Sequence, residues 1–173
     1  EQAKISSANI DALLLTHLHS DHVVDLYQLI ISSWHSYRVK PWKVYGPKGT
    51  RKFVRSIMQA WEYEREQRIL FEQRSSINAF NIIVQEFNKY GKIKIKDLII
   101  EYFEVDHQPV KYAYGFNFNH KKKKITISGD TKPCNNLMKF AQNADILLHE
   151  VFIEGELQSI NKMRTSKTLH NVK

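Results

Sequence analysis

The feature that most constrains this chain is a group of three histidines and one aspartate within six residues. The group consists of His17, His19, Asp21 and His22, and it follows an apolar segment at residues 9–16. Three consecutive leucines in that segment indicate a short buried strand. Because α/β folds present their active sites at the carboxyl ends of strands, this position indicates a functional site rather than an incidental group of surface histidines.

The spacing within the group indicates metal binding. Residues two apart in an extended chain point to the same side, so His17 and His19 can converge on one ion. Asp21 and His22 come at the turn into the next expected helix and can face a second ion. Imidazole nitrogen and carboxylate oxygen are the usual ligands of catalytic zinc, and two neighbouring ions can share a bridging hydroxide. The group therefore predicts a two-metal site, with zinc as the expected ion.

Apolar periodicity divides the rest of the chain into strands and helices. Strands are expected at residues 9–16, 42–45, 81–87, 92–105, 115–119, 125–128 and 144–151, and helices at 23–33, from 49 onward and at 135–141. The highly charged residues 62–74 are expected to form an exposed helix end or a mobile arm. This alternation is typical of an α/β class or a layered α+β class, and no obvious linker interrupts it.

Composition excludes several kinds of protein. Cys134 is the single cysteine, which excludes an internal disulfide and a cysteine-rich zinc site, and it fits a reducing, cytoplasmic location. No stretch is long and apolar enough to span a membrane, so no membrane partner is expected. The formal net charge of +8 favours anionic partners such as RNA, but richness in Lys, Ile and Asn throughout the chain explains it more simply. The sequence leaves the oligomeric state open and is compatible with a homodimer.

The histidine group resembles the His-x-His-x-Asp-His signature of the metallo-β-lactamase superfamily. The match is complete at His17, His19, Asp21 and His22. The resemblance implies an α/β fold with layered helices and sheets, the αββα sandwich. Only 16 residues precede the signature. Residues 1–173 are therefore interpreted as a partial metallo-β-lactamase-fold domain that lacks both ends of the sandwich.

Three later segments resemble the ribonuclease Z and arylsulfatase-like branch of this superfamily. His107 ends an expected strand and is followed by Tyr-Gly-Phe, which is similar to the branch's His-then-Gly-Tyr pattern. Asp130 lies in Ser-Gly-Asp-Thr, where the branch places the aspartate that binds both ions. Glu150 follows His149, as in the branch's His-Glu segment, where the acidic residue holds a later histidine through a hydrogen bond.

The resemblance thus implies a complete set of roles. The implied metal ligands are His17, His19, Asp21, His22, His107 and Asp130 for two zinc ions. Asp21 and Glu150 are the implied catalytic residues, with Asp21 orienting the hydroxide or accepting its proton. The family completes its second site with one further histidine. His170 is not assigned to that role, because no apolar strand precedes it.

The implied activity is that of a metal-dependent hydrolase in which a metal-bridging hydroxide attacks an ester-like bond. Phosphodiester, sulfate ester, lactone and thioester substrates all stay open. Ribonuclease Z often carries an inserted arm that grips tRNA, and here only residues 116–127 occupy the corresponding position. This favours a small-molecule ester as the substrate. The alternatives are a ribonuclease Z-like tRNA 3′-processing endonuclease, and a non-catalytic metal-binding protein, which the intact ligand set disfavours.

Overall fold

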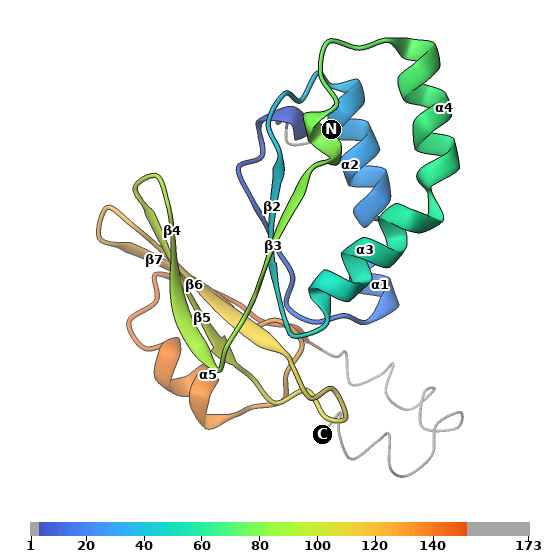
Figure 1. Ribbon diagram of the computed structural model, residues 1–173. Coiled ribbons are helices and arrows are strands. Elements are labelled where there is room, and N and C mark those ends of the chain that lie inside the picture. Colours follow the sequence, from blue (N-terminus) through green and yellow to red (C-terminus); the bar gives the residue numbers. More distant parts are fainter. Residues whose placement is uncertain (1–3, 152–173) are drawn as a thin grey trace. The chain divides into compact units, whose positions relative to one another are not determined.

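The computed structural model describes residues 4–151 (Figure 1). The chain divides into two compact units, Glu1–Phe87 and Asn88–Lys173, and each contains its own sheet. The α/β class expected from the sequence is confirmed. Within the described range, no helix has the length and apolar character needed to cross a membrane. His170 lies outside the described residues.

The first unit is built on a parallel sheet with the strand order β1-β2-β3. Its strands are β1 (Leu13–Leu14), β2 (Trp42–Gly46) and β3 (Ile82–Glu86). Parallel strands need long crossover connections, and helices supply them here. The helical elements are η1 (Ser7–Asn9), α1 (Ser20–Val23), α2 (Leu26–His35), α3 (Thr50–Ala60), α4 (Glu62–Glu72) and η2 (Asn78–Phe80).

The core of the first unit forms where these helices pack on the sheet. Leu26 and Ile30 of α2 and Val54 of α3 are buried in one cluster with Val44 of β2. Side chains spaced three or four apart on a helix share a face, which is why α2 contributes both of its residues to the same cluster. The sheet at whose edge the histidine group begins is thus fixed by apolar packing.

A buried arginine fixes the chain that leads into β1. Arg38 is 1% exposed, and its Nη1 donates to the carbonyl of Ile10 at 2.8 Å. Its Nε and Nη2 donate to the carbonyls of Lys40 and Pro41, both at 2.9 Å, and its guanidinium lies 3.9 Å from the ring centroid of Trp42. The fork of donors on one arginine therefore joins the segment before β1 to the segment before β2.

The second unit is built on a five-stranded sheet with the order β4-β5-β6-β7-β8. Its elements are β4 (Tyr90–Ile95), β5 (Leu98–Glu104), β6 (Tyr114–His120), β7 (Lys123–Ile127), α5 (Asn135–Phe140) and β8 (Ile146–Leu148). Strands β4 to β7 form an antiparallel meander, and β8 pairs with β7 in parallel. Phe103 of β5 stacks on Phe140 of α5 with ring centroids 4.5 Å apart, which anchors the helix on the sheet.

Two sequence expectations for these elements need correction or completion. The strand expected at 92–105 is wrong, because the chain turns at Lys96, where φ is 55°, and returns as β5. Neither Gly nor Asn-Gly occurs at this turn, so the residues that usually indicate a hairpin are absent there. Of the alternatives for residues 62–74, the structure has the helix, α4, which ends at Glu72.

Candidate metal centre

In the first unit, His17 and His19 lie in the loop that leaves the carboxyl end of β1, and Asp21 and His22 lie in α1, which follows this loop. The Leu15 N–H donates to the Tyr45 carbonyl at 2.8 Å, which extends the pairing with β2 up to the group. His19 then has an extended backbone, with φ −66° and ψ 147°, and directly precedes α1. The loop therefore starts from a fixed strand end and finishes at a helix, as the sequence predicts.

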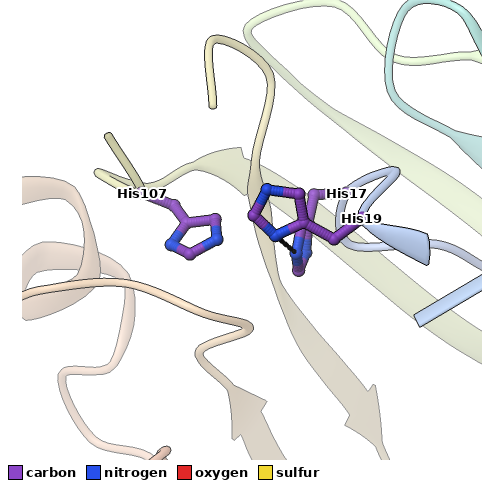
Figure 2. A group of neighbouring side chains, drawn as sticks. All are labelled: His17, His19 and His107. Atoms are coloured by element: carbon purple, nitrogen blue, oxygen red, sulfur yellow. Dashed lines mark hydrogen bonds between the residues drawn. The ribbon is translucent and has the colours of Figure 1, made fainter. Parts of the chain in front are cut away.

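His17 and His19 point toward each other, as Figure 2 shows. Nε2 of His17 lies 3.1 Å from Nδ1 of His19. The His17 ring also lies close to His22, with ring centroids 4.3 Å apart. His17 is fully buried, whereas His19 and His22 are exposed. Three imidazoles, those of His17, His19 and His22, are thus gathered together, and this donor set fits a divalent ion such as zinc.

The aspartate of the group lies beside one of these histidines. Oδ2 of Asp21 is 3.3 Å from Nε2 of His22, and the Asp21 side chain is 77% exposed. On the other side of the group, the Thr16 hydroxyl lies 3.1 Å from Nδ1 of His17. A hydrogen bond to one ring nitrogen orients the imidazole and fixes which nitrogen is left for a metal. The four residues predicted from the sequence are therefore brought together within this unit.

Packing from behind holds the histidine loop in place. A Cβ added to Gly49 would lie 3.3 Å from Cδ1 of Leu18, in the middle of the loop, and Gly49 has a φ of +104°. The Glu86 carboxylate, at the end of β3, accepts the N–H groups of Gly49 and Arg51 at 3.0 and 2.9 Å. These contacts tie the ends of the strands to the start of α3, against which the loop packs.

In the second unit, the remaining predicted residues follow three strands that run in the same direction. His107 follows β5, Asp130 follows β7 and Glu150 follows β8. Strands β5 and β7 are each antiparallel to β6, and β8 is parallel to β7. The carboxyl ends of all three strands therefore lie at the same edge of this sheet, together with the residues that follow them.

Hydrogen bonds connect the loops at this edge. The Thr131 hydroxyl accepts the N–H of Asp106 at 3.1 Å, and the Lys132 N–H donates to the Asp106 carbonyl at 3.0 Å. The Thr131 N–H donates to Oε1 of Glu150 at 2.6 Å. The neighbours of His107 and Asp130 are therefore bound to each other. Glu150 contacts the Asp130 loop, whereas the sequence suggested that it holds a later histidine.

Comparison with known proteins shows the family of this chain. Residues 1–163 match the family described as Anti-Pycsar protein Apyc1. The chain belongs to the Apyc1 family. A ribonuclease Z of Mycolicibacterium gilvum (strain PYR-GCK) is 31% identical over 164 residues, which cover 92% of this chain and 57% of that protein. The Apyc1-family chain thus spans less than two thirds of the length of this relative.

Solved structures of other proteins share the fold of this chain. Human tRNase Z, short form, matches with a TM-score of 0.67 and 21% identity over 92% of this chain and 64% of that one. The metallo-β-lactamase fold protein YhfI from Bacillus subtilis matches with a TM-score of 0.64 and 16% identity over 88% and 54%. The predicted metallo-β-lactamase fold is confirmed, and so is membership of the superfamily in its ribonuclease Z-like branch.

The sequence of this Apyc1-family chain singles out residues of metal-ligand type, but it does not indicate the residues that support them. Leu18, Gly49 and Glu86 hold the histidine loop, and Asp106 and Thr131 connect the loops of the second unit. The sequence indicates Gly49 only as the start of an expected helix. Nothing in the sequence indicated that Glu86 would cap that helix.

Proposed function

We propose that this chain is the catalytic part of a metal-dependent hydrolase that cleaves phosphodiester bonds in RNA. The observation that carries this proposal is the gathering of His17, His19 and His22 at a strand end, in a chain related to ribonuclease Z. The sequence alone favoured a small-molecule ester. The relatives favour the ribonuclease Z-like alternative over that preference, and they support RNA as the substrate class.

The proposed metal ligands are the six residues that the family resemblance implies. His17 and His19 would act with His107 on the first ion, Asp21 and His22 on the second, and Asp130 on both. When bound, such ions lower the pKa of water, which makes hydroxide available at neutral pH, and they offset the charge that develops on phosphate oxygens. All these side chains are imidazoles or carboxylates, which suit zinc and several other divalent ions.

Residues of the chain itself orient the proposed ligands and accept a proton. Asp21 has an exposed carboxylate, one oxygen of which contacts His22, and we assign to it the proton released by the attacking water. Thr16 orients the ring of His17 through Nδ1. Glu150 binds the Thr131 N–H and so fixes the backbone that carries Asp130. We therefore assign Glu150 a positioning role rather than direct contact with the substrate.

One observation favours a second candidate, a phosphodiesterase that acts on small molecules. Strands β6 and β7 are joined directly through Lys121 and Lys122, which occupy the turn with positive φ values. This hairpin contains no inserted arm of the kind that ribonuclease Z often uses to grip tRNA. RNA affinity would then have to come from other surfaces of the protein.

The experiment that tests the proposal compares both substrate classes with one preparation. Full-length protein, purified without chelator, is assayed on a tRNA precursor and on a small aryl phosphodiester at about 150 mM salt, where the Debye length is ~8 Å. We expect site-specific cleavage of the precursor, loss of activity on chelation and recovery with added zinc. His22→Ala should abolish cleavage, whereas His35→Ala, which removes a histidine paired with Glu72 outside the group, should not.

The other outcomes are equally informative. Turnover of the small diester alone, with the precursor intact, would replace RNA by small molecules as the substrate class. Absence of metal-dependent turnover of either substrate would overturn the assignment as a hydrolase and promote the non-catalytic alternative.

A further inference from the structure

A cleft lined by arginines lies in the first unit, among α3, α4, η2 and β3. These elements are labelled or can be followed by colour in Figure 1. The cleft has a volume of about 480 Å³, and no residue of the histidine group lines it. This volume lies within the range of about 300–1,000 Å³ that is usual for small-ligand sites. The cleft is therefore separate from the candidate metal centre and large enough to hold a ligand.

The charged residues that line the cleft are all positive. Arg51, Arg55 and Arg65 line it, and no acidic residue does. Arg65 is held in place, since its Nη1 donates to the Met58 carbonyl at 2.6 Å, and the nearest carboxylate, that of Glu62, is 3.9 Å from its Nη2. Three guanidinium groups around one cavity without a lining carboxylate favour an anionic ligand, and guanidinium matches phosphate geometry especially well.

Two of the arginines keep donors available for a ligand. Nη2 of Arg51 donates to the Val84 carbonyl at 2.8 Å, which fixes one end of the group and leaves its other N–H donors. Arg55 is exposed, and its guanidinium makes no hydrogen bond or ion pair with any residue in the range 4–151. Arg55 is thus the side chain in the cleft with the most donors to offer.

Apart from Asn81, the rest of the cleft is apolar. Val54 and Met58 of α3 line it together with Phe80, Ile82 and Ile77, and Ile77 is 52% exposed. A simple anion such as phosphate would gain nothing from these side chains. An unpaired nucleotide has both parts that the cleft matches, a phosphate for the arginines and a base with an apolar face. Proteins that bind single-stranded nucleic acid combine cationic and apolar contacts in this way.

We propose that this cleft binds an unpaired nucleotide of an RNA strand, with the phosphate at Arg51 and Arg55 and the base against Ile77 and Phe80. The choice of RNA rests on the proposed function. The cleft would supply RNA contacts that the short β6–β7 hairpin does not provide. Single-stranded RNA is favoured over a duplex because a paired base cannot present its face to the apolar wall.

The test measures binding apart from cleavage. The affinity of full-length protein for a fluorescent phosphorothioate oligouridylate, which resists hydrolysis, is measured by anisotropy over a range of salt concentrations. Arg55→Glu should weaken binding by about tenfold and should lower the slope of log affinity against log salt by about 0.7, the value for one phosphate on a single strand. Its matched control is Lys52→Glu, which makes the same charge change on an exposed residue of α3 outside the cleft. We expect Lys52→Glu to weaken binding less than about threefold.

Other measurements separate the cleft from the active site. Turnover of a small aryl phosphodiester should be unchanged in Arg55→Glu, and a duplex of equal length should bind at least about tenfold more weakly than the single strand. Equal effects of Arg55→Glu and Lys52→Glu, or equal binding of duplex and single strand, would overturn the proposal. If the oligouridylate binds through Arg55 but no RNA is cleaved, the cleft stands and the proposed function fails. If RNA is cleaved but Arg55→Glu binds the oligouridylate normally, the proposed function stands and the proposal for the cleft fails.

Discussion

In the first unit the ligand-type side chains are close together in sequence and contact one another, whereas in the second unit hydrogen bonds between neighbouring residues connect the separate loops that carry them. His17 approaches both His19 and His22 within one loop. His107 and Asp130 lie in separate loops, which Asp106 and Thr131 connect through hydrogen bonds. The first arrangement depends on the ligands themselves. The second depends on support from neighbours, so substitutions of supporting residues should affect the two units differently.

The largest expected effect comes from the ligands. His17→Ala removes the buried ring that the other two histidines contact, so metal affinity should fall by more than the ~10–100-fold that is typical for a supporting residue. Asp130→Ala should lower the occupancy of both ions, because this carboxylate is the proposed bridge, and His107→Ala should lower mainly one. Metal content per chain, measured by elemental analysis, checks all three variants. Full occupancy of two ions in Asp130→Ala would mean that the bridge is elsewhere.

The next effect tests the support in the second unit. Thr131→Val removes the hydroxyl that accepts the Asp106 N–H, so we expect metal affinity to fall by about 10–100-fold. Thr126→Val is the matched control. The buried Thr126 hydroxyl donates to Asn117 Oδ1 at 2.7 Å within the strands, away from the loops. Both variants should lose about 1–3 kcal/mol of stability, but only Thr131→Val should lose metal. Equal metal affinity in the two variants would contradict the supporting role.

A smaller effect is expected for Gly49, which lies against Leu18 of the histidine loop. Gly49→Ala places a Cβ at a backbone φ of +104° and close to Leu18, so it should cost about 1–2 kcal/mol and weaken metal binding through the displaced loop. Adding Leu18→Ala removes the close contact but not the backbone strain. Metal affinity should therefore recover in the double variant while the melting temperature stays low. Recovery of neither property would place the whole effect in the backbone.

The smallest effect concerns an ion pair that is distant in sequence from both sets of ligands. Burial raises the pKa of Glu64, but hydrogen bonds from Arg68 and Tyr27 outweigh it, so the pKa lies below its ordinary value of 4.5. A lowered pKa in the folded state adds stability above the ordinary pKa, and this stability is lost as the pH falls through the lowered value. The difference in unfolding free energy between the protein and Glu64→Gln should be about 1 kcal/mol at pH 7 and should shrink below pH 4.5. Metal affinity at pH 7 should not change.

The sequence singles out the ligand-type residues because their identity and spacing reflect chemistry that few other residues can perform. The positions of His17 and His19 follow from a strand that ends before them and a helix that begins after them, and His22 lies in that helix. Strands are likewise expected at 115–119 and 125–128, where the structure has β6 and β7. These features are local, so the sequence pattern contains the information needed to recognise them.

The supporting residues could not be predicted, because their roles depend on partners far away in the sequence. Glu86 caps a helix that begins 36 residues earlier, at Thr50, through contacts with Gly49 and Arg51. Arg38 could equally have been an exposed cation, and only its burial against Trp42 shows otherwise. The turn at Lys96 was missed for a different reason, since its residues are unusual for a positive φ.

The parallel pairing of β8 with β7 has a consequence for the order in which the two sets of ligands can form. Contacts within the histidine group span only a few residues, so they can form as soon as that loop and its strand are in place. The links of the second unit join Asp106 to Thr131, 25 residues apart, and Thr131 to Glu150, 19 residues apart. Contacts between distant positions are slower to form, because a longer loop must close first. During synthesis, a nascent chain can therefore assemble its histidine group well before Glu150 has emerged to tie the Asp130 loop.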